Sequence, residues 1–87
     1  MYEVEITPEG LRHLGRLPEK VHAAALETIL GPLRENPRRL GKPLVGELAG
    51  LMSARRGDYR IVYEIIDEER VTVIHRVQHR SVVYRPR

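Results

Sequence analysis

The sequence predicts an α+β fold, in which an N-terminal strand and a helical hairpin precede a three-stranded antiparallel meander. Three observations predict it: apolar residues alternate near both ends of the chain, they recur every four residues between Val21 and Leu33, and a Gly57-Asp58 turn separates two short runs. The expected product is a four-stranded, mostly antiparallel sheet with helices on one face. With 87 residues the chain forms one domain, residues 1–87, around one small core.

The first strand and the first helix follow from residues 2–9. Tyr2, Val4 and Ile6 alternate with polar residues, as in a half-buried strand. Thr7-Pro8-Glu9 then supplies an N-cap, a proline at the first helical position and an acidic first turn. We expect the strand to pair at an edge or beside the last strand.

The second helix begins at Leu17-Pro18-Glu19, and we predict a kink or a break at Gly31-Pro32 and an end at Asn36-Pro37. Its sheet-facing residues are Val21, Ala25, Ile29 and Leu33. Residues 37–50 contain several glycines and prolines, so we predict a loop there.

The meander consists of strands at about 51–56, 59–66 and 70–78. In the middle strand, alternation places Tyr59, Ile61, Tyr63 and Ile65 on one face and Arg60, Val62 and Glu64 on the other. In the last strand it places Val71, Val73, His75 and Val77 on one face and Thr72, Ile74, Arg76 and Gln78 on the other. His79 would share the face of His75. The hairpin arginines would project from the face without helices.

Positive charge is concentrated in two segments. The net charge is +3, but residues 34–60 and 75–87 carry +4 each, whereas residues 1–33 carry −2 and residues 61–74 carry −3. If the fold brings the two basic segments together, they form a surface suited to a polyanion such as nucleic acid. The alternative is a spread of solubilising charge.

Composition excludes several classes of site. The chain has no cysteine, so it has neither a disulfide nor a thiolate metal site. The four histidines show no metal-ligand spacing, so we expect no metal and no cofactor. No apolar run is long enough for a membrane span and the N-terminus is unlike a signal peptide, so we expect a cytoplasmic protein without a membrane partner.

The available side chains suit one reaction that needs no metal, the attack of an RNA 2′-hydroxyl on the adjacent phosphorus. The reaction needs a base, an acid and cations that hold the charge on the phosphorane. Arginine together with His79 or Tyr84 could supply all three. Tyr84, which stands between Arg80 and Arg85, could instead stack on a base or simply pack the tail on the sheet.

The chain resembles the RelE/ParE superfamily of toxins, and within it the RelE branch. The motif that carries the resemblance is Arg55-x-Gly57-Asp58-Tyr59-Arg60-Ile61-Val62-Tyr63, preceded by Gly50-Leu51 and followed by His79-Arg80 and Val83-Tyr84. Leu17-Pro18, Asn36-Pro37 and Gly41-Lys42-Pro43-Leu44 also match. The resemblance implies a type II toxin that cleaves mRNA in the ribosomal A site without a metal. It also implies a cognate acidic antitoxin that blocks the toxin, the pair repressing its own operon.

The resemblance also implies roles for single residues. Arg60 matches the arginine that stabilises the transition-state phosphate, Arg55 matches a neighbouring basic residue, and Tyr84 or the pair His79 and Arg80 matches the catalytic C-terminal end, where Gln78 could take the place of Arg80. The further residues that we expect to contact RNA or phosphate are Arg38, Lys42, Ser53, Arg56, Arg76 and Arg85.

The chain departs from the family pattern at Leu51 and Ser53, where the best-known RelE toxins have two lysines that serve in proton transfer. Lys42, Arg38 or Arg56 could compensate. Two alternatives therefore stay open beside the mRNA endonuclease: a ParE-like inhibitor of DNA gyrase, and a toxin that has lost catalysis and acts as a binding or regulatory partner.

Overall fold

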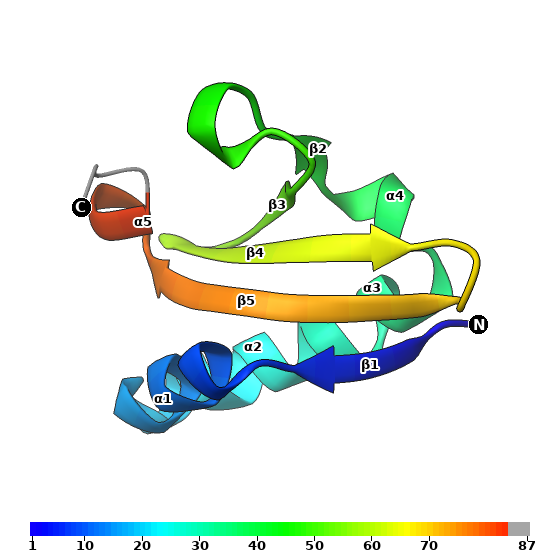
Figure 1. Cartoon of the computed structure of the whole chain (residues 1–87). Coiled ribbons are helices and arrows are strands. Elements are labelled where there is room, and N and C mark those ends of the chain that lie inside the picture. Colours follow the sequence, from blue (N-terminus) through cyan, green and yellow to red (C-terminus); the bar gives the residue numbers. More distant parts are fainter. Residues whose placement is uncertain (84–87) are drawn as a thin grey trace.

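Five strands form a single sheet in the order β1-β5-β4-β3-β2 in the computed structural model, which describes residues 1–83 (Figure 1). The strands are β1 (Glu3–Ile6), β2 (Lys42–Pro43), β3 (Met52–Arg56), β4 (Tyr59–Ile66) and β5 (Val71–His79). The helices are α1 (Pro8–Arg16), α2 (Glu19–Leu30), α3 (Pro32–Glu35), α4 (Pro37–Leu40) and α5 (Arg80–Val83), with a 3₁₀ turn at Gly46–Leu48. The α+β prediction is confirmed, and β1 pairs in parallel with β5 at one edge of the sheet.

The prediction of four strands and a plain loop at 37–50 was wrong. That segment holds α4, the two-residue strand β2 and the 3₁₀ turn, and β2 adds a fifth strand through the pairs Lys42–Ser53 and Pro43–Met52. Two paired residues are too few to produce a visible alternation in the sequence. Beyond β2, the Leu44 N–H donates to the Leu51 carbonyl oxygen at 2.9 Å, which closes the segment back onto the start of β3.

The predicted helix boundaries are confirmed. Thr7 caps α1, because its hydroxyl accepts a hydrogen bond from the Gly10 N–H at 3.0 Å. The long helical pattern breaks at Gly31-Pro32, where Pro32 starts α3, and α4 begins at Pro37. Because α3 continues the direction of the apolar stripe, Leu33 is buried together with Ala25 and Ile29.

The core lies between the sheet and α1, α2 and α3. Side chains from the middle of β4 and β5 pack against the apolar stripe of α2, and the cluster contains Leu14, Ala25, Ile29, Leu33, Ala54, Ile61, Tyr63, Ile74 and Val77. This layer fixes which face of each strand is turned away from the helices, and that second face carries the candidate site.

A β-bulge breaks the alternation that we predicted for the last strand. Val62 faces Arg76 and Tyr63 faces Ile74, so His75 is the extra residue on β5. As a result, Ile74 and Val77 both belong to the helix-side core although they are three positions apart. The prediction that His75 shares a face with Val77 was therefore wrong.

Candidate functional site

Three polar side chains form a row across the centre of the sheet. Arg55 on β3 pairs with Arg60 on β4, and Arg60 pairs with Gln78 on β5. Directly opposed residues have Cβ atoms about 5 Å apart. Since the neighbouring residues Ala54, Ile61 and Val77 belong to the helix-side core, the row lies on the opposite face of the sheet.

A second row lies beside the first on the same face. It consists of Lys42, Ser53, Val62 and Arg76, from β2 to β5. Val62 is fully buried, so it forms an apolar floor beneath its polar neighbours. We call these two rows the basic face: Lys42, Ser53, Arg55, Arg60, Val62, Arg76 and Gln78.

Arg60 is the most unusual cation of the basic face. Its Nη1 atom is buried and has no hydrogen-bond partner among the residues that the structure describes. Within residues 1–83 the Arg55 side chain donates only to the carbonyl oxygen of Gly57, at 3.3 Å, and neither Arg55 nor Arg60 forms an ion pair there. A buried guanidinium nitrogen without a partner is costly, and an anionic ligand would satisfy it.

Arg76 is less available than its position in the row suggests. Its Nε atom lies 3.9 Å from a carboxylate oxygen of Glu9 in the first turn of α1, and the two side chains are 19% and 31% exposed. This pair ties α1 to the edge of the basic face.

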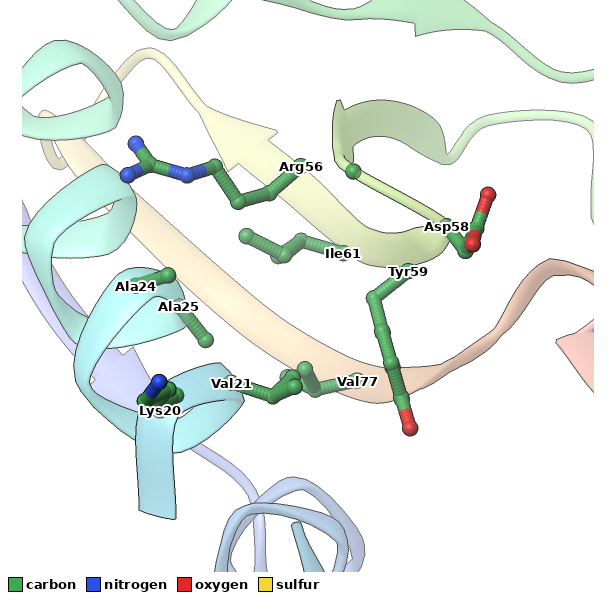
Figure 2. Close-up of a pocket in the computed structure, with 10 residues that line it drawn as sticks. Lys20, Val21, Ala24, Ala25, Arg56, Asp58, Tyr59, Ile61 and Val77 are labelled. Atoms are coloured by element: carbon green, nitrogen blue, oxygen red, sulfur yellow. The ribbon is translucent and has the colours of Figure 1, made fainter. Parts of the chain in front are cut away.

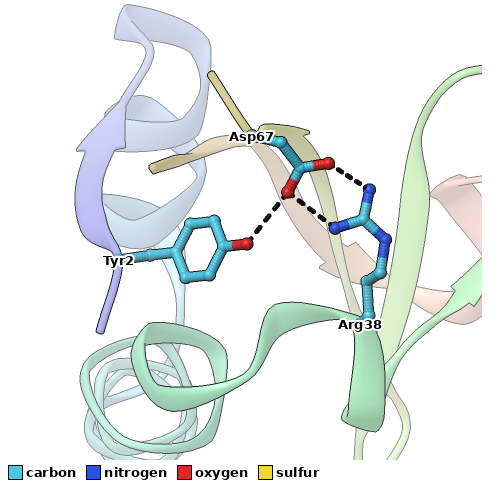
Figure 3. A network of polar contacts seen from close by, with 3 residues as sticks. All are labelled: Tyr2, Arg38 and Asp67. Atoms are coloured by element: carbon cyan, nitrogen blue, oxygen red, sulfur yellow. Dashed lines mark hydrogen bonds and ion pairs between the residues drawn. The ribbon is translucent and has the colours of Figure 1, made fainter. Parts of the chain in front are cut away.

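The structure does not bring Arg38 to this site. Its guanidinium donates two hydrogen bonds to Asp67, at 2.8 and 2.6 Å, in the turn between β4 and β5, where Asp67 also accepts from the Tyr2 hydroxyl (Figure 3). Hydrogen bonds from Arg38 and Tyr2 lower the pKa of Asp67. In turn, the hydrogen bonds to Asp67 and its negative charge raise the pKa of Arg38. The Arg38–Asp67 pair thus joins α4 to the turn that follows β4.

Arg56 lies on the helix side of the sheet, away from its neighbour Arg55. Its guanidinium reaches toward α2, where Nη2 lies 2.9 Å from Glu27 and Nη1 donates to the Thr28 hydroxyl at 3.4 Å (Figure 2). It borders an apolar groove between α2 and the hairpin, lined by Val21, Ala24, Ala25, Ile61 and Val77. Its predicted phosphate contact on the basic face has no support in this geometry.

Toward the C-terminal end, His79 ends β5 and Arg80 begins α5, and both are exposed. His79 faces Tyr59, and the two rings meet edge to face with centroids 5.5 Å apart. The Ser81 N–H donates to His79 Nδ1 at 3.2 Å, and the Arg80 N–H donates to the Asp58 carbonyl oxygen at 2.9 Å. Tyr84 and Arg85, the other two predicted residues of this end, lie outside the described residues.

His75 and His79 do not share a face as predicted. The bulge turns His75 to the side of the basic face, where its Nε2 atom lies 3.2 Å from a carboxylate oxygen of Glu64. Alternation along β4 alone places Glu64 on that face, so the strand pattern does signal it, although we predicted no role for it. The pairing with His75 depends on the bulge, which the sequence does not indicate.

The basic face can hold an anion by charge and by hydrogen bonds. Arg55 and Arg60 present guanidinium forks that match phosphate oxygens, Lys42 adds a mobile cation, and Gln78 and Ser53 supply neutral polar groups. Within residues 1–83, His, Asp and Glu side chains form no cluster of three or more that could hold a metal ion. No helix in the same range combines the length and apolar character needed to cross a membrane.

Comparison with known proteins gives a consistent family. Residues 4–84 match the family model of the ParE toxin of the type II toxin–antitoxin system parDE. The chain is 56% identical over 85 residues to Toxin RelE of Mycobacterium tuberculosis, covering 97% of this chain and 87% of that protein, and 49% identical over 84 residues to Toxin RelG of the same organism, covering 97% of each. In the toxin–antitoxin complex RelBE2 from Mycobacterium tuberculosis, one chain superposes with a TM-score of 0.86 at 49% identity, over 90% of this chain and 96% of that one.

Proposed function

This chain belongs to the ParE toxin family and is a toxin of a type II toxin–antitoxin system, and we propose that it cleaves mRNA in the ribosomal A site without a metal. The observation that carries the proposal is the row of Arg55, Arg60 and Gln78 on the basic face. The buried Nη1 of Arg60, which has no hydrogen-bond partner within residues 1–83, supports an anion site here over a solubilising surface.

In the proposed reaction the RNA itself supplies the nucleophile. The 2′-hydroxyl oxygen forms a bond to phosphorus, the bond from phosphorus to the 5′-oxygen breaks, and the products are a 2′,3′-cyclic phosphate and a 5′-hydroxyl. One proton leaves the 2′-oxygen and one reaches the 5′-oxygen. Arg60 would hold the extra negative charge of the phosphorane, with Arg55 beside it, because fixed cations stabilise charge as it develops.

Other groups would take the proton transfers and the flanking phosphates. We assign the proton transfers to Tyr84 or to Arg80 at the C-terminal end; His79, which pairs with Tyr59 on the helix side of the sheet, does not face the Arg60 row. Lys42 and Ser53, one row from Arg60, would contact the next phosphate along the strand. Arg38 and Arg56 receive no role in this proposal, since Asp67 and Glu27 hold their guanidinium groups elsewhere.

We further propose that an acidic antitoxin covers the basic face and blocks the toxin, and that the pair represses its own operon. Support comes from the complex RelBE2, whose toxin chain has the same fold as this one. The proposed target also places the active toxin in the cytoplasm, with the ribosome and mRNA as its other partners. An acidic partner suits a face on which Arg55 and Arg60 form no ion pair within residues 1–83, because complementary charge accelerates association.

The match to the ParE toxin family model keeps one second function under consideration, inhibition of DNA gyrase. The two functions differ in which nucleic acid is cut. A gyrase inhibitor produces DNA breaks and leaves mRNA intact, whereas the proposed endonuclease cuts mRNA with the period of the codon.

A translating extract tests the proposed function directly. The purified toxin is added to ribosomes that translate a defined mRNA, and the 5′-ends are mapped by primer extension, beside the same RNA without ribosomes. We expect cuts in phase with the reading frame only when ribosomes translate. Intact mRNA together with double-strand breaks in a gyrase reaction would support the second function instead.

A further inference from the structure

Tyr63 joins the centre of the sheet to the segment that leads into β2. The side chain is fully buried on the helix side of β4, where its register partners are Met52 and Ile74. Its hydroxyl donates a hydrogen bond to the carbonyl oxygen of Pro37, 26 residues away at the start of α4. One phenol therefore links β4 to a chain segment that lies two strands away.

Gly41 passes directly over the Tyr63 hydroxyl. A Cβ atom on Gly41 would meet that hydroxyl, and it would lie only 2.9 Å from Cζ of Tyr63 and 3.0 Å from the carbonyl oxygen of Ser53. Burial raises the pKa of Tyr63 to about 12, while the Gly41 backbone acts in the opposite direction by a smaller amount. At neutral pH the Tyr63 hydroxyl therefore stays protonated and donates its hydrogen bond to Pro37. The backbone of Gly41 packs against the same hydroxyl.

The residue after Gly41 is Lys42, and apart from the Tyr63 contacts β2 is fixed only by its two pairs with β3 and by the Leu44–Leu51 hydrogen bond among the described residues. The strand has only two residues, and Pro43 has no N–H to donate to β3. Lys42 is exposed, faces Ser53 and forms no ion pair among the described residues. Its place beside the Arg55 and Arg60 row therefore depends on how the preceding residues are anchored.

We propose that Tyr63 is a positioning residue, whose hydroxyl anchors residues 37–41 and so holds Lys42 on the basic face. The inference rests on the proposed function for the role of Lys42 toward RNA, and on the hydroxyl contacts alone for the anchoring. A purely packing role for Tyr63 makes a different prediction, because its effect would then be independent of Lys42.

A double-mutant cycle separates the two roles. Tyr63→Phe keeps the ring and removes the hydroxyl, and Lys42→Met removes the charge. We expect Tyr63→Phe to slow single-turnover cleavage in the translating extract by about five- to tenfold when Lys42 is present, and by less than about twofold in the Lys42→Met background. Ile29→Val, which deletes a buried methyl from the helix side, is the control for lost stability and should leave cleavage unchanged. Equal losses in both backgrounds would overturn the proposal.

Amide hydrogen exchange tests the anchoring without reference to activity. In Tyr63→Phe the Leu44 amide, which bonds to Leu51, should exchange at least about tenfold faster while the amides of β4 keep their protection. Unchanged exchange of the Leu44 amide in Tyr63→Phe would overturn the anchoring. Unprotected exchange of the Leu44 amide in the wild-type chain would also overturn it, and this second measurement does not require the variant to fold. A wild-type chain that does not cleave mRNA removes the proposed role of Lys42 toward RNA, and the exchange result then stands by itself.

Discussion

Arg55 and Arg60 face each other across the β3–β4 ladder, with no carboxylate between them among the described residues. Like charges directly opposed on a sheet destabilise it. The opposed charges of Arg55 and Arg60 therefore lower the stability of the folded chain at the point where we place the phosphate.

The first prediction is a trade between stability and activity at Arg55. Arg55→Gln keeps an N–H donor and removes one of the opposed charges, so we expect the free energy of unfolding to rise by roughly 0.2–1 kcal/mol while cleavage falls. Urea denaturation at low and high salt measures the effect. The gain should shrink at high salt, because screening already weakens the repulsion. A less stable variant would contradict the account.

Arg56 provides the matched comparison, since it is the next residue in the chain but lies on the other face. Arg56→Ala removes an exposed ion pair with Glu27 and a hydrogen bond to Thr28, and nothing from the basic face. We expect mRNA cleavage to stay within about threefold of wild type, with a stability change of at most about 1 kcal/mol. A loss of cleavage as large as that of Arg55→Gln would show that the two faces are wrongly assigned.

Two glycines should respond in opposite directions to a single methyl group. Gly41→Ala places the methyl on the Tyr63 hydroxyl, and we expect a loss of about 1–3 kcal/mol in the free energy of unfolding. Gly15→Ala, within α1, has nothing within 4 Å of the new methyl and should stabilise the chain by about 0.5–1 kcal/mol. Thermal denaturation of the two variants gives the comparison, and a neutral Gly41→Ala would contradict the close approach.

The Arg38–Asp67 pair predicts a pH dependence on the acid side. Because hydrogen bonds from Arg38 and Tyr2 lower the pKa of Asp67 in the folded chain, its contribution is complete above the ordinary value of 3.8 and is lost as the pH falls below it. We therefore expect Asp67→Asn to lower the melting temperature at pH 7, and to lower it by a smaller amount at pH 2. Glu68→Gln, in the same turn, is the control. An equal deficit at both pH values would argue against the pair.

Much of the fold was predictable because local chemistry determines it. The hairpin follows from the Gly57-Asp58 turn, where Gly57 has a φ of +60°, and the start of α1 follows from Thr7 and Pro8. Alternation from Tyr59 to Glu64 correctly separated the core face from the face of Arg60. These signals lie within a few residues of the structure that they determine.

The sequence did not indicate features that depend on distant partners. The bulge at His75 appears only in the register against Val62 and Tyr63, and β2 exists only because Ser53 and Met52 pair with it. The sequence predicted Arg38 as a phosphate ligand, but its guanidinium instead donates to Asp67, which is 29 residues away in the chain. Alternation along β4 predicted the face of Arg60, but the row that joins Arg55, Arg60 and Gln78 follows from the register of β3, β4 and β5, in which the bulge separates Gln78 from the face of Ile74.

The most direct test of the central claim is the single-turnover rate of ribosome-dependent mRNA cleavage by Arg60→Ala, with Arg12→Ala, an exposed cation of α1, as the charge-matched control. We expect Arg60→Ala to be slower than wild type by ~10²-fold or more, because a fixed cation at the developing charge is lost, and Arg60→Lys to recover part of the rate. Arg12→Ala should match the wild-type rate. An Arg60→Ala variant that cleaves as fast as Arg12→Ala would contradict the assignment of Arg60 and, with it, the proposed site.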